Sequence, residues 1–452
     1  MINKQKIENK IYKGIPRDYT VFLTKKLGKE FPQKGGIPMK NNSKILVETK
    51  ERIDKFAIQI AKGTSRPRRK FIRQMIYGIQ AARDVKVSEV SRSLCEKIKL
   101  IKTENRLSRQ LTREDLTERL NNNLLKISGK RIKEDTVIAL DLSDIRKEYA
   151  KKKEKMEGIW DGSKKEQGKG YWICEIVGAE VKGDEVMPLY SEAYSQSEEG
   201  FESENKKILK AIERVYNASG GKGILVMDRG GARPEIVVNI DKNGHKYVIR
   251  MLSGKHIKDR NGNKLSLKEL AKKTRCGIEY EIEVNKEGSK EKYGVKIGIA
   301  KDIKYEDIKI DIVVVRGFGE EELILATNTG KTGVEVLEIY LTRWKCEESF
   351  RFLKNEYNLE DIRVRSYVAI RNIVSILHAV FYFISVEINM RLRFSIVFKK
   401  LMEKAKRFFE VSIFKQYALA DGLGHLLFES GWQDMQPDTG KKSKQLTFNF
   451  RL

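Results

Sequence analysis

Residues 340–354 read YLTRWKCEESFRFLK, and the interpretation of the whole chain depends on this stretch. Its spacing of apolar and charged residues predicts one helix. At about 100° per residue, Tyr340, Arg343, Glu347 and Lys354 fall within roughly 60° of one another, on one stripe of that helix. Mixed charge on a helix is usually a solvated face. The stripe becomes a candidate site only if partner carboxylates occur elsewhere in the chain.

Two such acids follow apolar, strand-like segments. Asp141 comes directly after TVIAL, and Asp228 comes directly after GKGILVM. Ligands bind at the carboxyl ends of strands in α/β sheets, and a carboxylate buried there needs a partner or a cation. Adjacent carboxylates repel each other, and a divalent cation relieves the repulsion. Asp144 is the alternative to Asp141, and Glu348 to Glu347, but Asp144 lies further from the strand and Glu348 lies off the stripe.

The composition of the chain favours a polyanionic partner. Its 452 residues include 90 Lys and Arg against 63 Asp and Glu, which gives a net charge of +27. This surplus indicates nucleic acid first and an anionic membrane surface second. No apolar run reaches the ~20 residues of a membrane span. The longest run, 373–386, is interrupted by His378 and predicts a buried helix, so we expect no membrane association.

The cysteines and histidines exclude the commoner metal and redox sites. The four cysteines and four histidines are scattered and form no CxxC pair and no ligand spacing typical of zinc. The N-terminal MINKQKIENK lacks the apolar core of a signal peptide. We therefore expect a reducing compartment, the cytoplasm.

Changes in residue pattern divide the chain into regions. Helical periodicity with many Arg and Lys follows a basic arm, and it favours DNA contact over a bundle with a merely solvated basic face. Within it, SRPRRKFIRQMIYGIQAAR (65–83) predicts a basic helix with one apolar stripe. Three strands, a helix and a fourth strand then predict an α/β layer, before a strand-rich stretch and further helices. Thr332, with Glu335 three residues on, predicts a capping box at the start of the first of these helices. The predicted regions are the basic arm (1–44), a helical DNA-binding region (45–133), a first α/β part (134–233), a β-rich stretch (234–330), a second part with the Glu347 helix (331–390), and a C-terminal helical region with a flexible tail (391–452).

These motifs resemble the DDE transposases of the insertion-sequence-4 superfamily. That group carries a Tyr-x2-Arg-x3-Glu-x6-Lys signature, which Tyr340, Arg343, Glu347 and Lys354 match at every position. Its second acid commonly stands in an Asp-Arg-Gly triplet, here Asp228 to Gly230. Its first acid ends a strand and is often followed two places on by Thr or Ser. Asp141 with Ser143 fits that pattern, and the likeness covers about residues 136–380.

The resemblance implies a fold and a reaction. The fold would be α/β, a ribonuclease-H-like catalytic core interrupted by the β-rich insertion and flanked by helical N- and C-terminal regions. Asp141, Asp228 and Glu347 would be the catalytic residues and would hold two Mg²⁺ (or Mn²⁺) ions. The enzyme would cleave transposon ends by metal-dependent hydrolysis and join the 3′-hydroxyl ends to target DNA, with no covalent enzyme intermediate.

The resemblance also implies DNA contacts. Arg343 and Lys354 would bind backbone phosphates, and Tyr340 would contact a phosphate or stack near the terminal base. Trp344 flanks the stripe and is counted with the DNA-contacting residues. Arg229 is either a phosphate ligand or a salt-bridge partner for a metal-binding carboxylate. The partners would be transposon ends with terminal inverted repeats, target DNA, and a second copy of the chain in the DNA complex, in a bacterial or archaeal nucleoid.

Two further interpretations stay open. Gln445, Leu446, Thr447, Phe448 and Phe450 resemble peptides that dock in the replication sliding clamp, although a fraying tail with two aromatic residues fits equally well. The functional alternatives are a Mg²⁺-dependent nuclease without strand transfer and a non-catalytic DNA-binding protein descended from a transposase.

Overall fold

The computed structural model describes most of the chain between residues 40 and 432. The described residues are 40–147, 150, 152–161, 166–183, 185–259, 261–286, 289–388 and 416–432. The basic arm predicted at 1–44 lies almost entirely outside the described residues, as does the predicted clamp-binding motif at 445–450.

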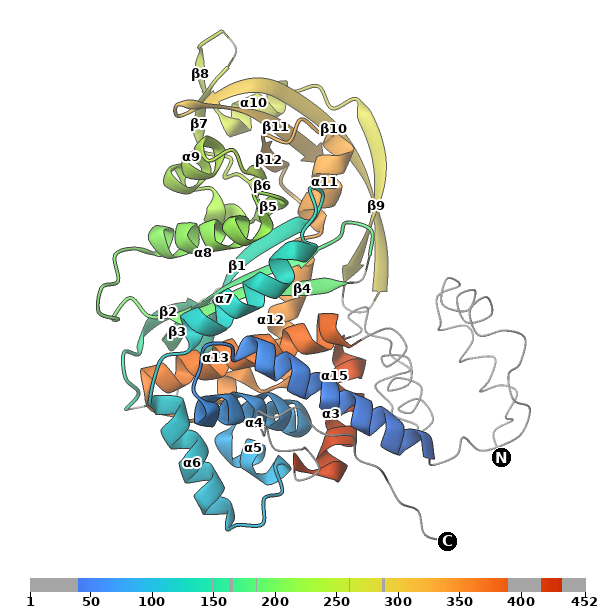
Figure 1. The fold of residues 1–452 in the computed structure, drawn as a ribbon. Coiled ribbons are helices and arrows are strands. Elements are labelled where there is room, and N and C mark those ends of the chain that lie inside the picture. Colours follow the sequence, from blue (N-terminus) through green and yellow to red (C-terminus); the bar gives the residue numbers. More distant parts are fainter. Residues whose placement is uncertain are drawn as a thin grey trace, which may run out of the picture.

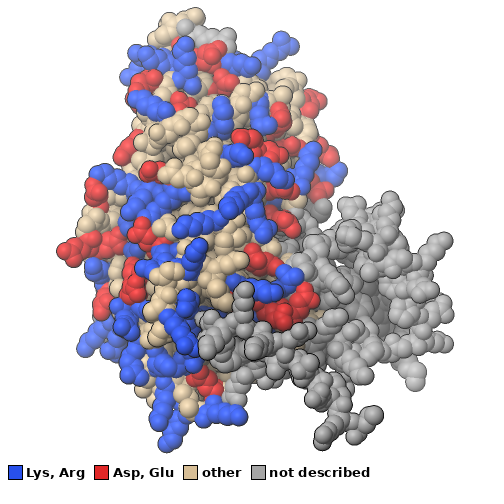
Figure 2. All heavy atoms as spheres, viewed as in Figure 1, with Lys and Arg blue, Asp and Glu red and all other residues tan. Residues whose placement is uncertain are grey.

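A group of helices forms one end of the molecule (Figure 1). It contains α3 (Lys40–Ile60), α4 (Arg66–Ala82), α5 (Val87–Ser93), α6 (Leu100–Thr112), α7 (Thr117–Ser128), α13 (Tyr367–Tyr382), the π-helical turn η4 (Phe383–Glu387) and α15 (Gln416–Ser430). Their apolar side chains share one core, which also includes residues of α12 and of the sheet. Lys and Arg side chains cover much of the visible surface of this end, with acids interspersed (Figure 2).

Helix α4 differs from the sequence prediction of a basic helix with a single apolar stripe. All its residues from Phe71 to Ala81 are buried, and so is Arg68. The reason is that α3, α5, α13 and α15 all pack against it, so that no side of its middle faces solvent. Its buried Arg73 pairs with Asp54 of α3, 3.1 Å between Nε and Oδ1. The centre of α4 is therefore a structural core element.

The strands form a 12-stranded mixed sheet in the order β2-β3-β1-β5-β6-β12-β11-β10-β7-β8, with β4 beside β3 and β9 beside β10. The strands are β1 (Val137–Arg146), β2 (Glu157–Asp161), β3 (Glu166–Ala179), β4 (Val186–Tyr194), β5 (Ile224–Met227), β6 (Lys246–Arg250), β7 (His256–Lys258), β8 (Lys264–Ser266), β9 (Ile278–Lys286), β10 (Ser289–Tyr305), β11 (Ile308–Arg316) and β12 (Leu323–Thr327). The strands predicted between 234 and 330 are thus continuous with the first ones, since β6 pairs with β5 and β12 pairs with β6.

Strand β1 is longer than the sequence predicted, and Asp141 lies within it rather than at its end. The parallel pairing with β5 covers only Val137–Ala139. Antiparallel pairing with β3 carries the strand on to Arg146 and places Asp141 opposite Glu175. Asp141 is therefore the second residue beyond the end of the β1–β5 pairing. Because β5 ends at Met227, Asp228 follows at the same edge.

Helices cover both faces of the sheet. One face, with Ile138 and Leu140 of β1, packs on α8 (Glu204–Ser219), α9 (Pro234–Lys242) and α10 (Leu267–Lys273). The opposite face of the parallel strands packs on α11 (Gly333–Leu341). Since side chains alternate along a strand, Asp141 continues the row of Val137 and Ala139 and lies on the α11–α12 side.

The predicted helix 340–354 is in fact two helices. Thr332 caps α11 through the predicted capping box with Glu335. The helix ends at Leu341, and α12 runs from Trp344 to Glu356. Tight hydrogen bonds join them: the Arg343 N–H donates to Tyr340 O and the Cys346 N–H to Arg343 O. Arg343 is the N-cap of α12 with helical backbone angles, so the signature spans a tightened turn. The sequence contains no Pro or Gly at this turn that could have predicted it.

The apolar run 373–386 forms a core helix, as its composition predicted. Among the described residues, Tyr367–Glu387 is long and apolar enough to cross a membrane, but 89% of its most apolar window is buried inside the protein. His378 within it is completely enclosed, with 1% of its surface exposed. This burial explains the apolar composition without a membrane.

Candidate active site

The candidate site lies where α12 crosses β1. The Arg343 guanidinium forms ion pairs with Asp141, 3.5 Å between Nη1 and Oδ2, and with Glu347 one turn further along α12. Asp141 also accepts a hydrogen bond from the Leu142 N–H at 2.9 Å. Arg343 and Asp141 are largely enclosed, whereas 47% of the Glu347 side chain is exposed. One arginine thus holds together two of the three predicted catalytic acids.

The third predicted acid, Asp228, affects Asp141 through its charge. Burial raises the pKa of the Asp141 carboxyl to about 7. Arg343 opposes this shift, whereas the negative charges of Asp228 and Glu347 reinforce it. A carboxyl affected by two other carboxylates is a place where added positive charge is stabilising. The structure therefore brings the influence of all three predicted acids together at Asp141.

Asp228 caps the short 3-10 turn η2 (Arg229–Gly231) and is held by its own backbone. Its Oδ1 accepts a hydrogen bond from the Gly230 N–H at 2.7 Å. The Asp-Arg-Gly triplet is compact because a Cβ on Gly230 would lie 2.9 Å from that oxygen. Arg229 is exposed and forms no ion pair with any carboxylate of the described residues. Of its two predicted roles, this placement favours phosphate contact.

Lys354 lies two turns beyond Glu347 and makes a second link between α12 and β1. Its Nζ is 3.4 Å from Asp144 Oδ1 and 3.1 Å from Glu360 Oε1. Asp144, the alternative first acid, is thus paired with a lysine. Glu348, the alternative third acid, pairs with Arg351 of its own helix. The preference for Asp141 and Glu347 over these two acids stays a prediction.

Tyr340 and Trp344 support the site from the end of α11 and the start of α12. Only 6% of Tyr340 is exposed, and it packs in the core between α11 and the sheet. The Arg343 guanidinium carbon lies 5.8 Å from its ring centroid, so a cation–π contact helps to orient the arginine. Trp344 is half-buried as the first residue of α12. Tyr340 in this position can orient Arg343 but is too enclosed to stack freely on a base.

The acids fit a divalent cation by their chemistry. Carboxylate oxygens are the ligands that Mg²⁺ and Mn²⁺ prefer, and the raised pKa of Asp141 marks a site short of positive charge. In the described part of the chain, no three His, Cys, Asp or Glu side chains stand close enough together to hold a metal ion. The Arg343 guanidinium lies between Asp141 and Glu347 instead.

Sequence reasoning missed a buried acid directly behind the site. Glu175 on β3 faces Asp141 across the strand pair and is 1% exposed. Burial first, and then Asp141, raise the pKa of Glu175 to about 8. Its Oε1 lies 4.0 Å from Nδ1 of His378, whose pKa burial lowers to about 3. The signal was present in the sequence, because alternation of Ile173, Glu175 and Val177 puts a lone acid on an apolar face.

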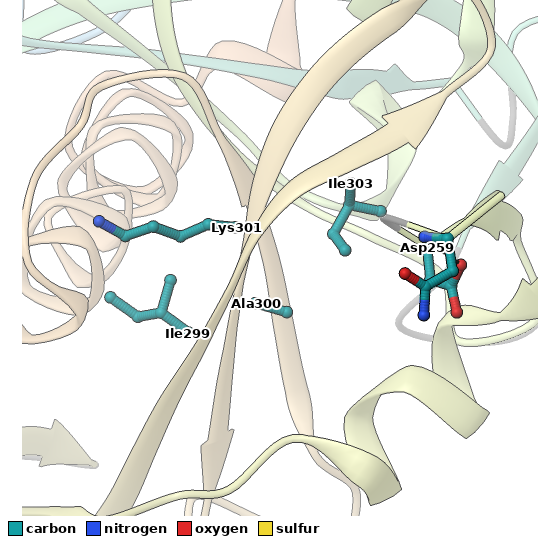
Figure 3. A pocket seen from close by; sticks show the side chains of 6 residues that line it. Asp259, Ile299, Ala300, Lys301 and Ile303 are labelled. Carbon is teal, nitrogen blue, oxygen red and sulfur yellow. Dashed lines mark hydrogen bonds between the residues drawn. The ribbon is translucent and has the colours of Figure 1, made fainter.

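A surface pocket elsewhere has no part in this arrangement. It lies against β10 and is lined by Asp259, Asn261, Ile299, Ala300, Lys301 and Ile303. Figure 3 shows Ile299 and Lys301 on one side of the strand and Ala300 and Ile303 on the side that faces Asp259. A β-bulge between Ala300 and Ile303 explains why these two share a side. The pocket contains none of the acids or cations predicted for catalysis.

Comparisons with known proteins show which family the chain belongs to. The family model described as "Transposase DDE domain" matches residues 132–383, which is more than half of the chain and includes all three predicted acids. Among solved structures, the chain is similar to a piggyBac transposase synaptic complex with hairpin DNA. The sequence identity is 10%, the TM-score is 0.42, and the match covers 86% of this chain and 81% of that one. A likeness of this size supports no argument of its own.

None of the curated proteins compared with the chain matches it. The family model therefore decides the assignment, and its match spans the described strands and both helices, α11 and α12, that carry the signature residues. The chain belongs to the family of transposases with a DDE catalytic domain.

Proposed function

We propose that this protein is a cut-and-paste DNA transposase of the insertion-sequence-4 superfamily, acting in a bacterial or archaeal nucleoid. It would bind transposon ends, cleave them by metal-dependent hydrolysis and join the 3′-hydroxyl ends to target DNA. The superfamily assignment rests on the signature Tyr340, Arg343, Glu347 and Lys354. The family match supports transposition, and the pairings around Arg343 support the choice of site.

The fold that we propose for the catalytic part is ribonuclease-H-like. Antiparallel β4, β3 and β1 followed by parallel β5 and β6, with α8 and α9 as connections, support this interpretation. The later strands up to β12 would then form the β-rich insertion, and β6 would count with the core. Residues 134–250 and 331–390 would then be the two parts of the catalytic domain, whereas the sequence pattern ends the first part at 233, before α9 and β6.

The observation that carries the proposal is the convergence on Asp141. Asp141 on β1, Asp228 after β5 and Glu347 on α12 come from segments far apart in the sequence. Burial is the largest cause of the raised pKa of Asp141, and the charges of Asp228 and Glu347 raise it further. In the described part of the chain, Arg343 is the one cation that pairs with Asp141 and Glu347. A buried carboxyl whose pKa is shifted by burial and by specific charged neighbours is typical of functional sites.

Asp141, Asp228 and Glu347 would together hold the divalent ions, Mg²⁺ or Mn²⁺. When bound there, such ions supply activation of a water molecule, or of a 3′-hydroxyl group, and stabilisation of the oxygen that leaves the phosphodiester. The carboxylates would also set the pH range of the reaction, because Asp141 must be ionised to bind a cation.

Arg343 would change partners during the reaction. With the cations bound to Asp141 and Glu347, the guanidinium would no longer be needed to neutralise the carboxylates and could hold oxygens of a backbone phosphate in bidentate fashion. Tyr340 would keep the guanidinium oriented through its ring. Lys354 would bind a neighbouring phosphate as a point charge, and Arg229 and Trp344 would contact DNA at the rim of the site.

The proposed partners follow from the reaction. Transposon ends with terminal inverted repeats and target DNA are the substrates, and two copies of the chain would act on two ends. The basic helices within 45–133 would contribute to end binding through their exposed residues. A contact of residues 445–450 with a sliding clamp would be an addition to this function.

A plasmid carrying the gene with its flanking DNA tests the proposal. With Mg²⁺, the purified wild-type protein should release a discrete fragment and insert it into a second plasmid. Asp141→Asn, Asp228→Asn and Glu347→Gln should each reduce cleavage by roughly 10³-fold or more, because each removes a ligand of the catalytic ions. The rate of fragment release, measured on gels, reports the effect.

Matched neighbours provide the controls. Asp144→Asn makes the same change three residues along β1, and Glu348→Gln makes the same change beside Glu347; both should keep cleavage within about tenfold of wild type. Release of the fragment without insertion would favour the nuclease alternative. Cleavage by Asp141→Asn at the rate of Asp144→Asn would show that the first acid is misassigned.

A further inference from the structure

The segment after α12 has a backbone fixed by lysines. The Lys147 ammonium donates to the Glu360 carbonyl, and Lys153 Nζ donates to the carbonyls of Ile362 and Val364 at 3.0 and 2.7 Å. The carbonyls of alternate residues from η3 (Leu359–Asp361) onward thus accept hydrogen bonds from two lysines of the region after β1. The Glu154 N–H also donates to the carbonyl of Arg365, at 3.1 Å. The backbone of 360–365 is therefore held along one side.

The side chains between those carbonyls face solvent. Ile362 is 1% exposed and Val364 packs against the core, whereas Asp361, Arg363 and Arg365 are exposed. Asp361 pairs with Lys86 at 3.1 Å. Within the described part of the chain, neither the Arg363 nor the Arg365 side chain forms a hydrogen bond or an ion pair with another residue. Two arginine side chains thus project two residues apart from the outer side of a segment whose backbone is held in place.

The surroundings of this segment are rich in positive charge. Lys354 lies between it and the candidate site, because its ammonium contacts both Asp144 and Glu360. Below the segment, burial and then Lys153 lower the pKa of Lys147 to about 7. Burial, followed by Arg365, lowers the pKa of Lys153. The acids nearby, Asp144, Glu360 and Asp361, are each already paired with a lysine.

We propose that residues 361–365 form a phosphate-binding track that continues from Lys354 away from the three acids, with Arg363 and Arg365 binding backbone phosphates of the DNA that leaves the site. The proposal rests on the proposed function, because it makes DNA the polyanion. The lysine-held backbone fixes the positions from which both arginines project before DNA arrives, so that binding orders their side chains without having to order the segment.

Binding to a random-sequence DNA duplex in EDTA tests the track without catalysis. Each phosphate contact contributes about −0.9 to the slope of log affinity against log salt. Arg363→Ala with Arg365→Ala should therefore make the slope shallower by about 1.8. Between about 50 and 200 mM salt, the double variant should lose about 12-fold less affinity than the wild type. Fluorescence anisotropy over that salt range measures both quantities.

The matched control is Arg275→Ala, which removes an exposed arginine on the far part of the sheet after α10. It should leave the slope unchanged, and an equal flattening by Arg275→Ala would overturn the proposal by showing a general charge effect. Arg363→Lys with Arg365→Lys should restore the wild-type slope, and a slope as shallow as that of the alanine pair would also overturn it. Circular dichroism melting should give the same Tm for all variants.

The two proposals fail in different ways. A wild-type protein that excises no fragment from the plasmid while Arg363→Ala with Arg365→Ala still flattens the salt slope would contradict transposition and leave the track standing. Normal excision with an unchanged slope in the double alanine variant would remove the track and leave transposition intact.

Discussion

Two buried charge clusters in this protein treat their acids in opposite ways. The Arg371 network joins Asp115, Glu192, Glu198, Lys207 and Arg371. In it, Arg371 contacts Asp115 at 2.7 Å and both glutamates at 3.1 Å. Lys207 contacts the same two glutamates, at 3.1 and 2.5 Å. At the candidate site, Arg343 is the one cation among the described residues that pairs with Asp141 and Glu347.

The pKa values record the difference. Burial raises the pKa of Glu192, but Arg371 and Lys207 outweigh it, and the pKa of Glu192 is lowered overall. At Asp141, burial together with Asp228 and Glu347 outweighs Arg343, and the pKa rises to about 7. Where the cations outweigh burial, the ionised acids stabilise the fold, whereas a further cation can bind where burial and neighbouring carboxylates outweigh the cation present.

The strongest test of this comparison is Arg371→Met, which asks whether the Arg371 network stabilises the fold. The change keeps the volume of the side chain but leaves Asp115, Glu192 and Glu198 short of a cation in a buried place. Removal of one partner from a buried ion pair typically costs about 3–5 kcal/mol, so we expect a loss of that size in the free energy of unfolding. Urea denaturation followed by circular dichroism at neutral pH measures it.

The control for Arg371→Met is Lys207→Met, which leaves Arg371 in contact with the same glutamates and should cost clearly less. If Arg371→Met lowered the free energy of unfolding by less than about 1 kcal/mol, the network would contribute no more than an exposed salt bridge. The contrast with the candidate site would then be lost.

Asp141→Asn probes the other side of the comparison. A carboxyl with a raised pKa is less favourable when ionised in the folded protein than in the unfolded chain, so its removal should not destabilise the fold. At pH 8 we expect the free energy of unfolding of Asp141→Asn to equal that of the wild type or to exceed it by up to about 2 kcal/mol, while cleavage is lost. Denaturation curves of both proteins at pH 8 decide it.

A loss of about 2 kcal/mol or more in Asp141→Asn would mean that this acid supports the fold as Arg371 does. Asp144→Asn serves as the reference, since it removes a carboxylate paired with Lys354 on the same strand.

The sequence predicted the acids of the site better than their geometry. Asp141, Asp228 and Glu347 could be found because each stands in a local pattern: an acid after an apolar strand, a triplet with Gly230, and a spaced helical signature. The break at Thr342 and Arg343 could not, because no Pro or Gly marks it and the tertiary contacts of α11 and α12 set the turn. The extension of β1 depends on its partner β3, which local sequence does not specify.

The same limit applies to charges. Arg343 and Arg371 both lie on predicted helices among apolar residues, and the sequence does not tell which one meets enough acids. Asp115, Glu192 and Glu198 reach Arg371 from three separate segments. Only the folded chain shows that cations outweigh burial at Glu192 but not at Asp141. The one-stripe prediction for α4 failed for the same reason, since four helices surround it.

Glu175→Gln tests the acids at the candidate site through the pH dependence of stability. Glu175 has a pKa of about 8 against an ordinary value of 4.5, so the folded protein keeps its proton between these values while the unfolded chain releases it. The stabilisation that comes from this proton is complete at low pH and is lost as pH rises through the window. From pH 6.5 to 8 the wild type should therefore lose about 1–2 kcal/mol relative to Glu175→Gln, which has no proton to release.

His378 does not disturb this window, because its lowered pKa affects stability only below its ordinary value of 6.5. Denaturation midpoints of both proteins at several pH values between 6.5 and 8 give the difference. Parallel pH profiles would show that Glu175 is ionised in the folded protein and finds a cation that the present pairings do not include.

Lys354→Ala should give the smallest effect. The ammonium is shared between Asp144 and Glu360, so only part of its charge is free for a phosphate. We expect the salt slope of DNA binding to become shallower by less than the about 0.9 of one full contact, with Lys272→Ala on α10 as the exposed lysine control. An unchanged slope would mean that Lys354 only links α12 to β1, and that it stays paired with its carboxylates when DNA binds, like the cations around Arg371. A change near 0.9 would mean that DNA displaces both carboxylates from it, and Lys354 would then belong with Arg343 to the cations that change partners when the substrate binds.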